Sequence, residues 1–147
     1  MTLQDVKRKI KSLGFEEDAT MEEYNEIVCD SVDRAVQYIF DSTVKLMAPY
    51  YKRELSTDGD EWEPTRPDNI TVDTEDDIEI DLPDDLQELV PLLAAYHIWL
   101  DDDERKATMY YNNFVQKRDA IIEANMSTVK ATIMPTINGV KWLGVGW

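Results

Sequence analysis

The strongest constraint on the fold is an apolar repeat with the period of an α-helix in the last third of the chain. Its members recur at i, i+3, i+4, i+7, i+14 and i+15: Ala107, Tyr110, Tyr111, Phe114, Ile121 and Ile122. Such spacing places one apolar stripe along a helix. The run Asp101–Glu104 just before it offers an aspartate as N-cap and further acids for the positive end of the helix dipole. We therefore expect a long amphipathic helix that begins at this run.

An apolar segment on the other side of this acidic run predicts a partner helix. Pro83 suits the first helical position, whereas Pro91 leaves two alternatives, a kinked helix or a regular helix that begins later. Because the connection is short, the two helices should lie antiparallel and form the nucleus of the fold. The expected core stripe of the partner helix is Leu86, Leu89, Val90, Leu93, Tyr96 or His97, and Leu100.

A short helix is expected near the N-terminus, from Thr2 to Leu13. Thr2 and Asp5 have the spacing of a capping box, and Gly14 suits the helix stop. Two interpretations stay open for its outer face, a solvated helix surface or a docking site for an acidic partner. That face carries the densest basic cluster of the chain: Lys7, Arg8, Lys9 and Lys11.

A longer helix should follow from the capping box Thr20–Glu23. Its broad apolar face continues past Val44 and Met47, until Pro49 kinks or ends the helix. A helix of this length exceeds what a compact bundle of this size needs. Its apolar face therefore serves either the core alone or both the core and a neighbouring subunit.

The segment of residues 56–85 differs in composition from the rest of the chain. It holds thirteen acidic side chains, opposed only by Arg66. Helical periodicity is absent, while Ile70–Val72 and Ile78–Ile80 have the pattern of two short strands that pair as a hairpin. Long loops in small domains are usually functional or disordered. We interpret this segment, as far as residue 81, as a projecting acidic arm that contacts a partner.

The chain carries no acidic side chain after Glu123. Residues 127–147 have the pattern of extended chain with a turn at Asn138–Gly139, which predicts a helical domain over residues 1–126 followed by a C-terminal tail. Trp142 and Trp147 are costly to leave in water. The tail therefore either folds as a strand onto its own domain or docks on another subunit.

Together these elements predict a mainly α fold, a small helical bundle with a long acidic loop or β-hairpin insertion and an extended C-terminal tail. The 147 residues include 31 acidic and 15 basic side chains, for a net charge of −16. Such a surface repels phosphate backbones and anionic lipids, so neither nucleic acid nor a membrane is expected as an adhesive partner. No secretory signal or run of the roughly 18 apolar residues that cross a bilayer is present. The protein is therefore expected to stay where it is made. A single Cys29 cannot form an internal disulfide, which fits a reducing compartment.

The inventory of reactive side chains disfavours catalysis and cofactor binding. One histidine and one cysteine are too few for a structural zinc site, and the motifs of phosphate loops, zinc proteases and serine hydrolases are absent. Asp58–Glu61 lacks the spacing of an EF-hand, and nothing distinguishes two of the carboxylates as an acid and a base. We interpret His97 as a core or interface residue, and we expect no enzymatic activity, cofactor or metal.

One stretch of the chain resembles a known family. It begins with Ile78–Leu89, continues through the apolar run Leu92–Leu100 and the acidic break Asp101–Glu104, and ends with Arg105–Ala107 leading into Tyr110–Phe114. This order of residue types and lengths is similar to that of the head-to-tail connector (adaptor) proteins of tailed bacteriophages. The N-terminal helices fit the family in size and order, whereas the tail fits only in being extended.

The resemblance implies a non-enzymatic virion structural protein, made in the host cytoplasm and located in the neck between head and tail. In this family many copies, commonly twelve, form a homo-oligomeric ring beneath the portal protein. The ring continues the DNA channel without binding DNA specifically, and it presents a lower surface to the stopper or tail protein. Since C-terminal segments of the family commonly reach the portal, the candidate portal-binding residues are Val140, Trp142, Leu143 and Trp147. Candidate contacts to the channel or the next ring are Asp58, Asp60, Glu61, Asp76 and Asp77.

The charge of the chain fits the implied role. A channel lined by carboxylates repels phosphates within about 10 Å at moderate salt, so DNA can pass without being held. Ring assembly also requires acidic subunits to approach one another, and we therefore expect basic side chains at the subunit boundaries. The candidate inter-subunit residues are Lys7, Arg8, Lys9, Lys117 and Arg118, together with Lys45, Lys52 and Arg53.

Two other functions stay open. Another neck protein, a stopper or a tail-completion protein, would more often be rich in β-structure. An acidic module that imitates DNA and binds a nuclease or a repressor would use the acidic arm as its binding surface. Competition by short duplex DNA for the partner distinguishes such a DNA mimic from an adaptor.

Overall fold

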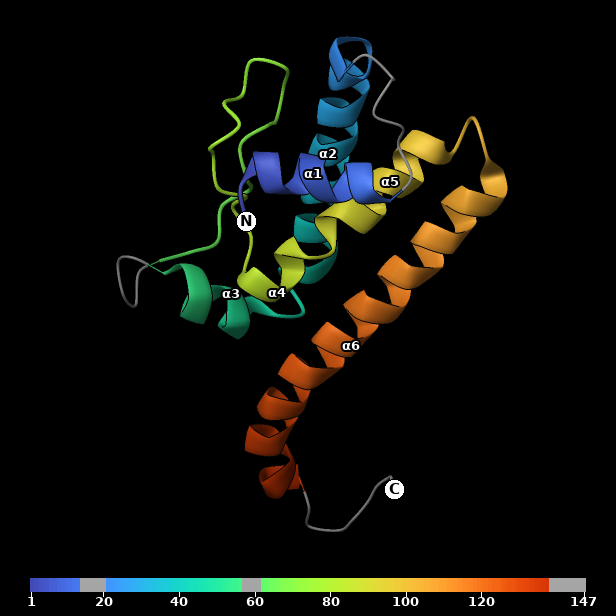
Figure 1. Ribbon diagram of the computed structural model, residues 1–147. Coiled ribbons are helices and arrows are strands. Elements are labelled where there is room, and N and C mark those ends of the chain that lie inside the picture. The colour runs from blue at the N-terminus through green and yellow to red at the C-terminus, as the bar shows by residue number, and fades with distance from the viewer. Residues whose placement is uncertain (14–20, 57–61, 138–147) are drawn as a thin grey trace.

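The most apolar helix of the chain lies at the centre of the fold. The computed structural model describes the backbone of residues 1–13, 21–56 and 62–137, and the side chains within 1–13, 24–56 and 62–125. Helix α5 (Val90–Trp99) contacts α1 (Leu3–Ser12), α2 (Met21–Thr43) and α6 (Glu104–Ile137). Figure 1 shows α6 folding back from the end of α5 and then leading away from the other helices. The predicted mainly α bundle is confirmed.

Helix α5 is apolar around its whole circumference, and its neighbours cover it on several sides. Val90, Leu93 and Ala94 are almost completely buried, as expected for a helix without a polar face. Pro91 lies in the first turn of α5, where its missing N–H leaves no hydrogen bond unmade. Of the two alternatives for Pro91, the helix that begins later is therefore correct. The residues before it form the short helix α4 (Asp84–Gln87).

The predicted starts of α1 and α6 are confirmed. The Asp5 N–H donates to Thr2 Oγ1 at 3.2 Å, and the Thr2 N–H donates to Asp5 Oδ2 at 2.9 Å, which completes the capping box. At the other helix, the Lys106 N–H donates to Asp103 Oδ1 at 3.2 Å. These side chains satisfy backbone N–H groups that have no partner within their own helix. Gly14, the expected stop of α1, lies outside the described residues.

Helix α2 ends at Thr43, so the prediction that it continues past Met47 is wrong. The Thr43 hydroxyl donates to the Ile39 carbonyl at 2.6 Å and shares a buried hydrogen bond of 2.7 Å with the Tyr51 hydroxyl. The turn after Thr43 buries Met47 and Tyr51, which are 2% and 0% exposed. Pro49 lies in the first turn of a further helix, α3 (Ala48–Leu55), and does not end α2. Burial of these two large side chains requires the chain to turn back toward the core.

The predicted hairpin between Ile70–Val72 and Ile78–Ile80 is wrong for the described loop, residues 62–83. The β-bridge recorded there joins Glu79 to Thr2. The Leu3 N–H also donates to the Ile78 carbonyl at 2.9 Å. The first N–H groups of a helix lack partners within the helix, and the carbonyls of this loop supply them at the start of α1.

Helix α6 has 34 residues and ends at Ile137, so the prediction of an extended chain is wrong for residues 127–137. The predicted boundary between residues 126 and 127 falls inside this helix, which is about 50 Å long. Extending an existing helix requires no new nucleation, and the valine and threonines of this stretch lower helix propensity by only about 0.7 kcal/mol each. Pro135, which removes a backbone N–H and costs about 3 kcal/mol in a helix interior, lies in the last turn of α6. Asn138–Gly139 and the rest of the tail lie outside the described residues.

Phe114 is the side chain that joins α6 most firmly to the core, since it is 0% exposed. We expect Phe114→Ala to lower the free energy of unfolding by about 3–5 kcal/mol, because it leaves a large cavity. Urea denaturation followed by circular dichroism measures this change. Met109→Ala on the same helix is the control, because Met109 is 48% exposed. A similar loss in both variants would contradict the packing of α6 described here.

Candidate interaction surfaces

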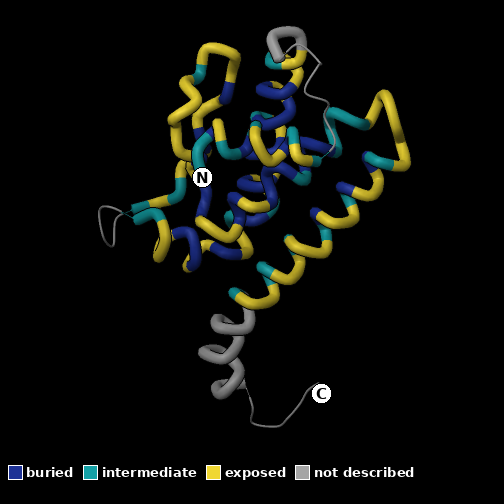
Figure 2. Tube along the Cα trace, viewed as in Figure 1, coloured by how far each residue is buried: buried dark blue, intermediate teal, exposed yellow. Residues whose placement is uncertain are grey.

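The first part of the acidic loop, residues 62–83, is hydrogen-bonded to α2. Gln37 Nε2 donates to the Pro67 carbonyl in a buried hydrogen bond of 2.9 Å. The Ile70 N–H donates to Asp33 Oδ1, also at 2.9 Å. Both acceptor and donor side chains come from α2, so the described part of the loop is fixed to the bundle along this helix. Figure 1 shows it standing beside α2, and Figure 2 shows that most of its residues are exposed.

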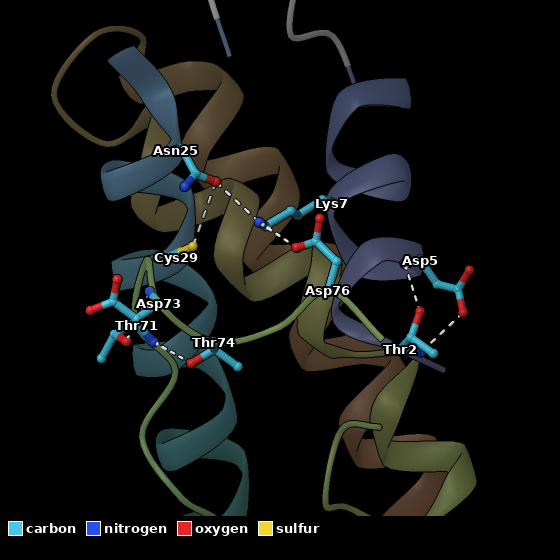
Figure 3. Close-up of polar contacts among 9 residues, drawn as sticks. All are labelled: Thr2, Asp5, Lys7, Asn25, Cys29, Thr71, Asp73, Thr74 and Asp76. Carbon is cyan, nitrogen blue, oxygen red and sulfur yellow. Dashed lines mark hydrogen bonds and ion pairs between the residues drawn. The ribbon is translucent and has the colours of Figure 1, made fainter. Parts of the chain in front are cut away.

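The tip of this loop is ordered by a local turn, shown in Figure 3. The Thr71 N–H donates to Thr74 Oγ1 at 2.9 Å, and the Asp73 N–H donates to Thr71 Oγ1 at 3.2 Å. Hydroxyl groups that satisfy nearby backbone groups in this way stabilise turns. The ordered tip exposes four carboxylates, those of Asp73, Glu75, Asp76 and Asp77, of which Asp76 pairs with Lys7.

Lys7 joins the loop tip to α1 and α2. Its Nζ atom lies 2.9 Å from Asp76 Oδ1 and 3.0 Å from Asn25 Oδ1, and its side chain is only 14% exposed. Figure 3 shows the ammonium group between the carboxylate and the amide. The Asp76 side chain is 55% exposed, so solvent still partly screens this pair. We call these three residues the Lys7 clasp.

Cys29 lies beside the Lys7 clasp but is not exposed to solvent. Its thiol donates to Asn25 Oδ1 at 3.7 Å, and the residue is 1% exposed. Burial raises the pKa of the Cys29 thiol. A buried thiol with a raised pKa is a weak nucleophile, so this cysteine has a packing role in the described structure.

Replacing Lys7 with alanine should loosen the loop tip from α1. The Leu3 and Gln4 N–H groups donate to loop carbonyls at 2.9 Å, so their hydrogen exchange reports on this contact. We expect exchange about fivefold faster in Lys7→Ala, corresponding to about 1 kcal/mol of local stability. The control is Arg105→Ala, because Arg105 is exposed at the start of α6, away from α1 in the sequence and in none of these contacts. Unchanged protection in Lys7→Ala would contradict the clasp.

Arg8 and Lys9 lie on the solvent side of α1, and both are exposed. With Met1, Asp5 and Ser12 they line a groove of about 410 Å³, which we call the α1 groove. Arg8 lies 3.5 Å from the Asp5 carboxylate, which also lines the groove, so the three charged side chains together carry one net positive charge. That charge suits an acidic group of a partner. The sequence placed Lys7 in the same set, but the structure engages the Lys7 ammonium within its own chain.

The other candidate inter-subunit residues lie on different elements from the α1 groove. The Arg118 guanidinium stacks on the Phe114 ring at 5.4 Å and pairs with Asp119 at 3.2 Å. The Arg53 guanidinium stacks on the Tyr50 ring at 5.2 Å. The structure therefore does not gather the predicted cations into one patch. The remaining ones are exposed on α6, on α3 and in the turn before α3: Lys117, Lys52 and Lys45.

A row of aromatic rings lies along α5 and α6, and the sequence did not single it out as a group. The ring centroids of Tyr96 and Tyr111 are 4.9 Å apart, and those of Tyr111 and Phe114 are 6.0 Å apart. His97 extends the row, with its ring centroid 5.1 Å from that of Tyr96. Burial lowers the pKa of His97, and the charge of Arg34 lowers it further. Contacts of this kind are those of a packed histidine.

The lowered pKa of His97 predicts a pH-dependent contribution to stability. The unfolded state binds a proton at His97 more readily than the folded state, so acidification through the unfolded value of about 6.5 favours unfolding. We expect the stability of the wild type relative to His97→Gln to fall as the pH is lowered through about 6.5, the value of the unfolded state. Urea denaturation of both proteins at several pH values measures this difference. The titration of the carboxylates largely cancels because both proteins contain the same carboxylates. A difference that does not change with pH would contradict the lowered pKa.

An acidic groove of about 320 Å³ lies between the end of α3 and the residues before α4. Glu54, Glu79, Asp81 and Asp84 contribute its carboxylates. The Glu79 carboxylate pairs with the N-terminal ammonium at 2.9 Å. Among the residues whose side chains are described, no group of three or more His, Cys, Asp or Glu side chains is arranged to hold a metal ion.

Comparison with protein-family models, with curated proteins and with solved structures finds no match. Within the described ranges, no helix combines the length and apolar character needed to span a membrane.

Several predicted contact residues lie outside the described ranges. They are Asp58, Asp60, Glu61, Val140, Trp142, Leu143 and Trp147.

Proposed function

We propose that this chain is a virion structural protein, an adaptor whose ring joins the portal to the stopper or tail protein and continues the DNA channel. The observation that carries the proposal is the segment of residues 78–122, which resembles the head-to-tail connector family. This segment comprises α4, α5 and the first half of α6, and α5 packs on α6 in the centre of the bundle. The resemblance therefore coincides with the nucleus of the fold.

The acidic loop supports the channel part of the proposal. Between Asp73 and Asp85 the chain carries eight carboxylates and no basic side chain. Asp77 is exposed at the tip, and Asp76 keeps its carboxylate 55% exposed although it pairs with Lys7. A ring of such loops would place a high density of negative charge around its axis. That charge repels DNA phosphates at short range and lets the duplex pass without adhesion.

Helix α6 supports the portal part of the proposal. It runs for 34 residues, and the contacts described between it and the bundle reach Asn125, which accepts a hydrogen bond from Arg53 of α3. Its C-terminal end lies far from the bundle in Figure 1. The chain that follows Ile137 therefore starts at a distance from the core. An aromatic segment attached at that position is well placed to reach a partner above or below the ring. In this proposal Val140, Trp142, Leu143 and Trp147 bind the portal protein.

Removal of residues 138–147 tests the portal contact. We expect the shortened protein to keep the circular dichroism of its helices and to lose attachment to the cognate portal in negative-stain electron microscopy. Trp142→Ala with Trp147→Ala should weaken attachment at least about a hundredfold, since buried aromatic residues dominate the energetics of interfaces. Met109→Ala, which removes an exposed apolar side chain from α6, is the control. Normal attachment of the shortened protein would refute the anchor assignment.

The same preparation separates the adaptor from its alternatives. A stopper or tail-completion protein would bind the preformed adaptor ring and not the portal. A DNA mimic would bind a nuclease or a repressor, and short duplex DNA would compete with it. Direct binding to the portal that duplex DNA does not displace is the result expected for the adaptor.

A further inference from the structure

We propose that the α1 groove binds the acidic loop tip of a second copy of this chain. The cations of the groove are Arg8 and Lys9, and the anions of the tip are Asp73, Glu75 and Asp77. This inference rests on the proposed function, because it names the contact between neighbouring subunits of the ring. It assigns the subunit contact to one pair of surfaces, whereas the sequence predicted basic residues spread over several elements.

Charge complementarity identifies the second copy as the occupant. The chain has a net charge of −16, yet four of its fifteen basic residues fall within the ten residues of α1. The loop tip has the opposite composition, with five acidic residues from Asp73 to Glu79 and no basic one. Each copy therefore presents an anionic surface and a cationic surface that match each other.

The helical geometry of α1 places these two surfaces on different flanks. Successive residues of a helix are about 100° apart, so Lys9 is rotated by about 200° from Lys7 and the two side chains point about 160° apart around the helix axis. Lys7 holds the loop of its own chain on one flank through the 2.9 Å contact to Asp76. Lys9 and Arg8 line the groove on the other flank. The tip therefore cannot enter its own groove while the Lys7 clasp is closed.

The order of the tip favours binding. The hydrogen bonds of Thr71 and Thr74 and the ion pair of Asp76 with Lys7 fix the backbone that carries Asp73, Glu75 and Asp77. A segment fixed before it binds loses less conformational entropy on association than a free one. The clasp uses one carboxylate of the tip and leaves its neighbours directed to solvent, where a second molecule can reach them.

A contact of this kind repeats from copy to copy. Because one patch meets a different patch on the neighbour, the association is head-to-tail, and each added copy presents the same two surfaces again. Such a contact forms a closed ring when the rotation between copies closes, and a filament when it does not. The proposed adaptor ring requires the first outcome.

Exchange of charges between the two surfaces tests the contact. Arg8→Glu with Lys9→Glu reverses the groove, and Asp73→Lys with Asp77→Lys reverses the tip. Each variant alone should self-associate at least about tenfold more weakly than the wild type in sedimentation velocity at about 20 mM salt. An equimolar mixture of the two variants should recover association, because each supplies the surface that the other needs. If the groove variant loses helicity, the single variant Lys9→Glu replaces it, and if the tip variant loses helicity, Asp77→Lys replaces it.

Arg34→Glu with Arg105→Glu is the matched control, because it changes the net charge as much as the groove variant does, at exposed sites on α2 and α6. Its association should stay within about twofold of the wild type. A wild type that remains monomeric at low salt, an equal loss in the control, or a mixture that does not recover would each overturn the contact. Portal binding by a protein that is monomeric alone would overturn only this contact. Self-association without portal binding would overturn only the adaptor function.

Discussion

Burial of α5 is the constraint on which the rest of the structure depends. A helix that is apolar on every side has no stable position in water, so other elements must surround it. Helix α1 contributes Leu3, Val6 and Ile10 to the core that covers it, and all three are almost completely buried. Helix α6 contributes Ala107 and Phe114 from its first turns, both 0% exposed. Ile121 and Ile122 still pack against the core, and Asn125 accepts a hydrogen bond from Arg53 of α3. Beyond them, α6 leads away from the bundle in Figure 1.

Features that depend on residues close in sequence were predicted correctly. The Thr2 capping box, the Asp103 cap and the helical period through Phe114 each follow from neighbours within one or two turns. The end of α2 depends instead on a hydrogen bond between Thr43 and Tyr51, which forms only once the core has assembled. No local pattern distinguishes that turn from a longer helix, because the intervening residues are compatible with both.

The interaction surfaces were predictable as charge clusters but not as pairs. The sequence shows a basic stretch around Lys7 and an acidic stretch around Asp76, yet these residues are 69 positions apart and no spacing rule connects them. The Ile78 carbonyl accepts a hydrogen bond from the Leu3 N–H, and this contact sets the register of the loop. The segment Ile78–Ile80, expected to pair with Ile70–Val72, therefore contacts the start of α1 instead. Only the Thr71–Thr74 turn carried a local signal, since a threonine near the start of a turn can satisfy backbone groups.

The Lys7 clasp has a consequence for how assembly would proceed. It links α1 to the loop tip, so a neighbouring copy that bound either of them would also restrict the motion of the other. The next copy then meets a surface that has already lost part of its freedom, and its own ordering cost is smaller. In the proposed ring, growth by this route would therefore be cooperative, with a slow first encounter and easier later additions.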